Sequence, residues 1–174
     1  MSAFFEFDEV DSFAATAIGE PGSRVFYLHA RAGRERVTVK CEKQQVAAIA
    51  QYLRKVLADL PPADERPMTG TAEARTSEEA FVLGPIGLGY DRANDRLLVQ
   101  LEELVPADLA AGDDDEETGA AEPVDRGHVR LYVTRGQAAA FCEHADELVA
   151  AGRPPCQWCG GPIDPDGHPC PRMN

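Results

Sequence analysis

The C-terminal end of the chain carries four side chains whose types and spacing suit a single metal ion. They follow the pattern C-x2-C-x8-H-x-C and are Cys156, Cys159, His168 and Cys170. Two cysteines separated by two residues fit a tight turn that directs both thiolates at one ion, and three thiolates with one imidazole complete the tetrahedral shell that zinc prefers. A closed four-ligand shell leaves no position for water or substrate, so the pattern predicts a structural zinc site without a catalytic residue.

The segment that carries these ligands, residues 153–174, is rich in glycine and proline and poor in apolar residues. Such a composition buries too little surface to fold by packing alone, so a bound metal would supply the missing stability. Gly160 suits the turn after the second cysteine because glycine tolerates left-handed backbone. Residues 164–167 (DPDG) predict the reversal that brings the last two ligands back. We expect Trp158, between the first two ligands, to shield the site, with contact to a partner as the alternative.

Two alternatives to this site stay open at the level of the sequence. The H-x-C spacing is tighter than usual, so the fourth ligand is either His168 or one of Asp164, Asp166 and a water molecule. A water in the fourth place would leave the metal open for catalysis. The thiolate-rich donor set also suits an iron–sulfur or redox role.

The remaining cysteines and the N-terminus bear on the cellular compartment. Residues 1–10 include no basic residue, so they do not resemble a signal peptide, and no apolar run is long enough to span a membrane. We therefore expect a cytoplasmic protein without membrane contact, in which disulfides are rare. Cys41 and Cys142 lie apart from the metal-ligand pattern in apolar segments, and we interpret them as small buried hydrophobes rather than reactive thiols.

Most of the chain alternates between strand and helix patterns. Short apolar runs bounded by turn residues predict strands over 12–19, 24–30, 35–41, 80–90, 96–105 and 128–134. Phe4, Phe5 and Phe7 suggest a further short strand. Apolar residues at spacings of three and four predict amphipathic helices over 46–60 and 137–151. Thr134 and Gly152 suit the N-cap and C-cap of the second helix.

The order of these elements, three strands and a helix twice over, predicts an α+β fold. The simplest architecture packs two helices on one face of a mainly antiparallel sheet, with a degenerate βββα duplication. We expect residues 1–152 to form the α+β domain, with halves 1–62 and 78–152 and a linker at 63–77. Residues 153–174 then form a separate zinc-binding tail.

The formal net charge of −13 is unevenly distributed. Residues 106–126 form an acidic loop with seven acidic residues and no basic one between Pro106 and Pro123, and the rest of the chain carries about −6. The loop is most simply a solvated insertion, with a docking site for a basic partner as the alternative. No cluster of lysine and arginine supplies the phosphate-neutralising surface that nucleic-acid binding needs, so we expect no nucleic-acid partner.

Several other motifs carry less weight. Gly84–Gly89 resembles a phosphate-binding loop only loosely, because no Lys-Ser/Thr follows, and glycines in a bulged strand explain it better. Glu102 and Glu103 are more typical of exposed strand-end carboxylates than of an acid–base pair. The remaining histidines fall on separate predicted elements and form no triad with a serine; they are His29, His128 and His144.

Four stretches of the sequence together resemble one family. They are the N-terminal FEFD..D.F.A...GEPG.R.FYL.AR.G, the helix start EK.QV, the central LGYD, and the ending AAGRPPC..CG.P.DP.GH.CPR.N. The chain resembles, from Phe5 to Asn174, an uncharacterised family of actinobacterial proteins of the domain-of-unknown-function kind. The resemblance implies cytoplasmic proteins without an assigned activity, whose genes often lie near a histidine-phosphatase-like and a kinase-like gene. The four metal ligands match the family ending residue for residue, and the acidic loop matches least.

The sequence therefore supports three hypotheses about function. The first is a non-enzymatic protein-interaction module in which the zinc-binding tail forms part of the contact surface with a protein partner. The second is an enzyme acting on a small phosphorylated or acidic metabolite, with Arg24, Arg130 and Arg135 as anion contacts. The third is a thiol-based redox sensor, in which oxidation of the cysteines ejects the metal.

Overall fold

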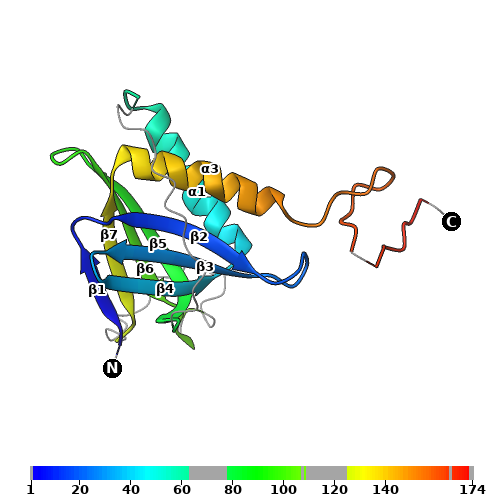
Figure 1. Ribbon diagram of the computed structural model, residues 1–174, viewed down its shortest axis with the longest axis horizontal. Helices are drawn as coiled ribbons and strands as arrows, with labels where there is room; N and C mark the ends of the chain where they lie inside the picture. Colours follow the sequence, from blue (N-terminus) through cyan, green and yellow to red (C-terminus); the bar gives the residue numbers. More distant parts are fainter. Residues whose placement is uncertain (1, 63–77, 107, 109–124, 165, 173–174) are drawn as a thin grey trace, which may run out of the picture.

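The computed structural model describes residues 2–62, 78–106, 108, 125–164 and 166–172 (Figure 1). Its elements are β1 (Phe4–Phe7), β2 (Ser12–Ile18), β3 (Val25–Ala32), β4 (Glu35–Cys41), α1 (Lys43–Ala58), β5 (Phe81–Asp91), β6 (Arg96–Glu103), β7 (His128–Val133) and α3 (Arg135–Ala150). The predicted α+β class and all the predicted strands, including the short first one, are confirmed. The expected linker, 63–77, and most of the acidic loop, 106–126, lie outside the described residues.

The strands form one seven-stranded sheet in the order β1-β7-β6-β5-β4-β3-β2. Four neighbouring pairs are antiparallel, whereas β1 with β7 and β4 with β5 are parallel. The sheet is strongly curved, so that β2, β3 and β4 cross in front of β5, β6 and β7 in Figure 1. Helices α1 and α3 cross each other and cover the concave face.

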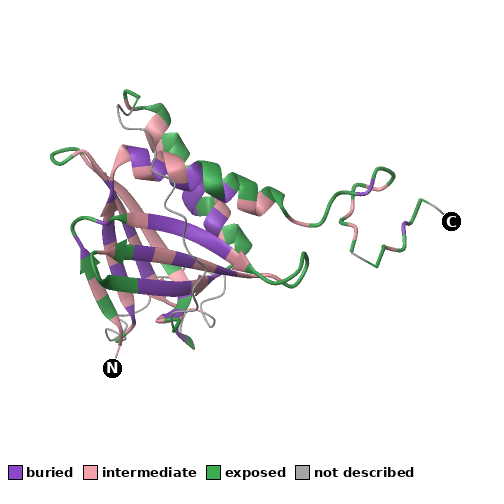
Figure 2. Cartoon of the chain, in the orientation of Figure 1, coloured by how far each residue is buried: buried purple, intermediate pink, exposed green. Residues whose placement is uncertain are grey.

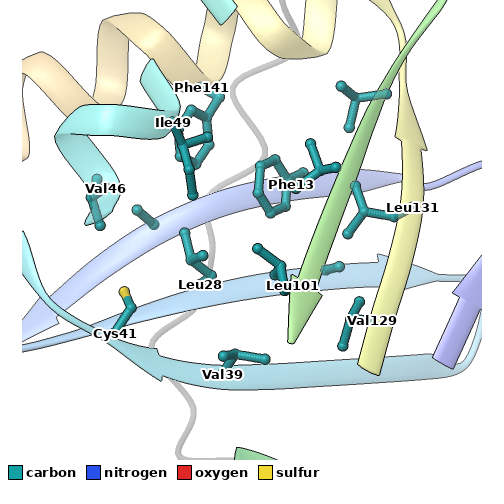
Figure 3. Close-up of a cluster of buried hydrophobic side chains, with 14 of the residues drawn as sticks. Phe13, Leu28, Val39, Cys41, Val46, Ile49, Leu101, Val129, Leu131 and Phe141 are labelled. Atoms are coloured by element: carbon teal, nitrogen blue, oxygen red, sulfur yellow. The ribbon is translucent and has the colours of Figure 1, made fainter. Parts of the chain in front are cut away.

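The core lies between the curved sheet and the two helices (Figure 3). Strand β7 shows the alternation that produces it: Val129, Leu131 and Val133 are buried, and the residues between them are half-exposed. Helix residues join the same cluster, and the rings of Phe13 and Phe141 stack with centroids 4.7 Å apart. Both helices thus bury their apolar stripe on one face of the sheet, as predicted.

The two halves of the sheet repeat one another. In the first half, β1 and β2 together count as the first strand, followed by β3 and β4, and in the second half the strands are β5, β6 and β7. Each helix begins directly after the third strand of its half, β4 or β7, and each is 16 residues long. Each third strand also pairs in parallel with the start of the other half's first strand, so that Val39 faces Phe81 and Leu131 faces Phe7. The two phenylalanines are equivalent, and both are buried. The predicted βββα duplication is therefore present in the topology.

Equivalent kinks interrupt the first strand of each half. In β5 the pairing register shifts between Leu83 and Ile86, and in the first half residues 8–11 separate β1 from β2. A glutamine in the first turn of the other half's helix holds each kink. Gln45 Nε2 donates to the carbonyls of Leu83 and Gly84, at 3.2 and 3.3 Å.

The second glutamine repeats this contact, because Gln137 Nε2 donates to the carbonyl of Val10, at 2.6 Å. Each glutamine also accepts, through Oε1, the backbone N–H of its own N-cap residue, Glu42 or Thr134, at 2.9 Å. One side chain therefore caps a helix and ties it to the opposite half.

The bounds of both predicted helices, 46–60 and 137–151, differ from the structure by one to three residues. The first helix begins at Lys43 rather than at residue 46, because its first turn is polar and lies outside the apolar stripe. Thr134 is the N-cap of α3 as predicted, accepting the N–H of Gln137. The C-cap is Ala151 rather than Gly152, whose prediction was wrong: Ala151 donates to the carbonyl of Glu147. Within the described residues, no helix combines the length and apolarity needed to cross a membrane.

The two bridging glutamines give a test of this architecture. We expect Gln45→Ala and Gln137→Ala each to lower the free energy of unfolding by about 1–2 kcal/mol, because each removes one cap and leaves a kink carbonyl unpaired. Urea denaturation followed by circular dichroism measures it. The control is Gln51→Ala on the exposed face of α1, which should change stability by less than about 0.5 kcal/mol. Equal effects of all three variants would contradict the bridging role.

Candidate metal centre

The tail leaves the body at the end of α3 and projects beyond it, as Figure 1 shows for the orange and red segment. Its base is held against the turn between β2 and β3. The side chain of Arg153 lies so close to Gly22 that a Cβ there would come within 3.3 Å of the arginine Cδ. From the same turn, Arg24 Nη1 donates to the carbonyl of Leu148 in α3, at 3.4 Å. The start of the tail therefore lies beside the β2–β3 turn of the first half.

The first two ligands lie on a tight turn. The N–H of Gly160 donates to the carbonyl of Cys156 at 2.9 Å, and the N–H of Cys156 donates to the carbonyl of Gly161 at 2.7 Å. Gly160 has a φ of +72°, the left-handed conformation predicted for it. The turn brings the Cys156 and Cys159 sulfurs to the same side.

The last two ligands return through a second turn. Gly167 has a φ of +92° and donates its N–H to the carbonyl of Asp164 at 2.9 Å, which confirms the predicted reversal. The Asp164 carboxylate is paired with Arg153 Nη1 at 2.7 Å. Asp164 is therefore paired with Arg153 at the base of the tail. The fourth member of the ligand group is His168, not Asp164.

The four predicted ligands converge. The sulfur atoms of Cys156, Cys159 and Cys170 and a ring nitrogen of His168 all lie within 4.8 Å of one another. The Cys156 and Cys170 sulfurs are 3.9 Å apart, too far for a disulfide, and the Cys159 sulfur lies 3.3 Å from His168 Nε2. Ideal tetrahedral zinc bonds place two sulfurs about 3.8 Å apart and sulfur and nitrogen about 3.5 Å apart. The Cys156–Cys170 and Cys159–His168 distances therefore match those of a tetrahedral metal site, and the four ligand atoms lie close enough together to hold one ion.

The electrostatics of the group favour a cation. The backbone N–H groups of Cys159 and Trp158 point at the Cys156 sulfur and lower the pKa of that thiol. For Cys170, the Arg172 backbone N–H acts in the same direction, but burial and the neighbouring thiols outweigh it and raise the pKa. Three thiolates at this spacing repel one another, and a divalent ion among them removes that repulsion.

Trp158 does not shield the ligands, and that prediction was wrong. The residue is 63% exposed, although its backbone N–H donates to the Cys156 sulfur at 3.4 Å. Figure 2 shows that most of the tail is exposed and that its buried stretches are short.

The two remaining cysteines differ from the three ligands. Cys41 on β4 and Cys142 on α3 are both buried in the hydrophobic core. Burial raises the pKa of the Cys41 thiol to about 12 and raises that of Cys142 as well. Cys142 donates to the carbonyl of Ala50 at 3.3 Å. Both are the small buried hydrophobes that the sequence indicated.

The three arginines proposed as anion contacts do not converge. Arg24 contacts the end of α3, as described above. Arg130 lies beside Glu6 at 3.7 Å and donates to the Tyr132 hydroxyl at 2.8 Å. Arg135 pairs with Asp95 at 2.8 Å. Each arginine serves a different structural contact.

A cavity that the sequence did not indicate lies at the hairpin end of the second half. It has a volume of about 570 Å³ and is lined by Asp8, Glu9, Asp91, Asn94, Arg96 and Tyr132. These residues come from three separate segments, so no local spacing in the sequence could have revealed them. Asp91 accepts backbone and side-chain N–H groups of Asn94 and Ala93, which lower its pKa and hold the hairpin loop.

The remaining carboxylates, histidine and glycines considered as functional candidates in the sequence have structural roles. Glu103 accepts the N–H of Gly127 at 2.7 Å, and Glu102 pairs with Arg126 at 3.4 Å. The two carboxylates therefore have separate partners and do not act together as an acid–base pair. His29 bridges two hydroxyls, with Nε2 2.7 Å from Thr16 and Nδ1 3.0 Å from Thr38, and burial lowers its pKa. Gly84–Gly89 lies within β5 at the register shift, as predicted.

The two classes of cysteine predict different reactivity. After removal of metal by a chelator, iodoacetamide at pH 8 should label the three tail cysteines and leave Cys41 and Cys142 unmodified, because their burial blocks thiolate formation and access. Peptide mass spectrometry identifies the labelled sites. Denaturant should make all five reactive. Labelling of Cys41 in the native protein at the rate of the tail cysteines would contradict the assignment.

Comparison with known proteins gives the family of the chain. The model of the family described as "Protein of unknown function (DUF3090)" matches residues 5–170, which include all four candidate ligands. No curated protein and no solved structure was found to match. The match spans both βββα halves together with the tail, and the chain therefore belongs to the DUF3090 family.

Proposed function

We propose that the protein is a non-enzymatic interaction module whose tail is folded around one structural zinc ion and contributes to the contact with a protein partner. The observation that carries the proposal is the convergence of four soft and borderline ligands on a segment that also presents an exposed tryptophan. Four protein ligands complete a tetrahedral shell, which leaves no coordination position for water or substrate.

Zinc is the ion that the donor set favours. Three thiolates and an imidazole in tetrahedral arrangement are typical of structural zinc sites, while magnesium and calcium require oxygen ligands. The tail has little apolar surface to bury, so its two turns need a cross-link at their centre. Unpaired thiolates also require a reducing compartment, which supports the cytoplasm as the location.

The interaction role rests on Trp158. It is more exposed than any other described aromatic residue except Phe4, and its backbone is fixed by the turn that carries the first two ligands. Tryptophan is among the residues that contribute most to protein–protein affinity, and a rigid mount lowers the entropy lost on binding. The tail projects from the body, so a partner can reach this side chain.

The zinc assignment predicts one zinc ion per chain in the purified protein, measured by inductively coupled plasma mass spectrometry. Cys156→Ser should abolish stoichiometric zinc. His168→Ala should weaken zinc binding by on the order of 100-fold or more, since loss of an outer-shell partner alone costs about 10- to 100-fold. Gln157→Ala, between the first two ligands, is the matched control and should retain full zinc. Full zinc in Cys156→Ser would refute this ligand set.

The interaction role predicts a partner that depends on Trp158. Tagged protein is cross-linked in native lysate, and captured proteins are quantified by mass spectrometry for wild type, Trp158→Ala and Tyr52→Ala. Removing a central tryptophan typically costs about 2 kcal/mol or more, or roughly 30-fold in affinity. Tyr52, an exposed aromatic on α1, is the control and should retain the partner. A partner captured equally by all three proteins would argue against contact through the tail.

A further inference from the structure

The three cysteines of the metal centre differ in exposure. Cys156 and Cys170 are 7% and 9% exposed, whereas Cys159 is only half-buried. The Cys159 sulfur accepts the N–H of Gly161 at 3.4 Å and lies beside His168 Nε2. Cys159 is therefore the ligand cysteine that is most open to a small molecule approaching from solvent.

We propose that Cys159 is an oxidation site at which the zinc-bound thiolate attacks a hydroperoxide and thereby opens the metal centre. The proposal rests on the zinc site described above and adds to it a way of controlling the tail. Thiolates are the reactive form of cysteine, and accessible thiolates with a neighbouring thiol are the ones that oxidise reversibly.

The reaction balances with the hydroperoxide as the only oxidant. The Cys159 thiolate attacks the outer peroxide oxygen, the O–O bond breaks, and the released alkoxide takes a proton and leaves as the alcohol. Cys159 is now a sulfenic acid. The thiolate of Cys156 or Cys170, each within 4.8 Å, then attacks this sulfur, and the S–O bond breaks with loss of hydroxide, which is protonated to water. Two thiolates have supplied two electrons, and a disulfide has formed.

Loss of the metal follows from the change in ligands. A disulfide removes two of the three thiolates, and the remaining thiolate and imidazole hold zinc weakly. The glycine- and proline-rich tail then lacks its central cross-link, and the turn that fixes the Trp158 backbone to the Cys156 sulfur is released. Oxidation would therefore remove the tail's contact surface, and reduction with zinc would restore it.

The experiment uses the full-length zinc-loaded protein. Its zinc content is measured first, and cumene hydroperoxide is then titrated against a chromophoric zinc indicator. Dimedone traps sulfenic acid, and mass spectrometry locates the adduct. Trp158 is the single tryptophan of the chain, so its fluorescence reports the tail directly. We expect the first adduct at Cys159, release of the zinc, a disulfide within the tail, and no change at Cys41 or Cys142.

Two ligand-retaining variants test the site of attack. Cys159→His and Cys170→His each keep four ligands, and each removes one sulfur, the accessible one or a buried one. We expect Cys159→His to slow zinc release by on the order of tenfold or more, while Cys170→His stays near wild type. If either variant fails to hold zinc, the order of dimedone trapping in wild type decides.

The outcomes separate this inference from the zinc proposal. Absence of zinc from the purified protein would overturn both. Zinc that is present but retained under excess hydroperoxide would overturn only the oxidation site. First trapping at Cys156 or Cys170, or equal protection by the two histidine variants, would show that accessibility does not direct the attack and would likewise overturn it.

Discussion

The fold depends on the exchange of parallel strand pairing between its two halves. The third strand of each half can pair on its outer edge only with the start of the other half's first strand, as Val39 does with Phe81 and Leu131 with Phe7. The kinks that follow let the same strands turn back to pair within their own half. Neither half can complete its sheet alone, so the helices, the core and the fixed base of the tail all require both.

The patterns that predicted the fold were those with a local physical cause. Burial on one face directly causes the alternation in residues such as Val129 and Leu131 and the periodicity of α1 and α3. Both patterns predict the observed elements. The exchange of strands was not predictable, because it depends on pairing between residues far apart in the chain. Gln45 and Gln137 gave no signal for the same reason: a glutamine in a first helical turn is ordinary until the partner carbonyl is known.

The metal ligands were predictable because thiolate and imidazole chemistry limits what a close C-x2-C and H-x-C pair can do. The exposure of Trp158 was not, since it depends on the path of the turn, in which the backbone N–H of Trp158 donates to the Cys156 sulfur. The prediction that three arginines contact an anion failed for a different reason. Their charge suited an anion in the sequence, but each is occupied by a nearby carbonyl, hydroxyl or carboxylate in the fold. Charge alone identified neither a pocket nor a ligand.

The contact between Cys142 and the Ala50 carbonyl has a consequence of a different kind. These residues hold the same position in α3 and α1, so at the helix crossing each half touches its own counterpart. Self-contact of this sort defines an isologous interface, the arrangement found in two-fold symmetric dimers. The chain thus has the geometry of a dimer of βββα protomers fused into one polypeptide. Its tail, attached after the second protomer, breaks that symmetry and gives the molecule one distinct end.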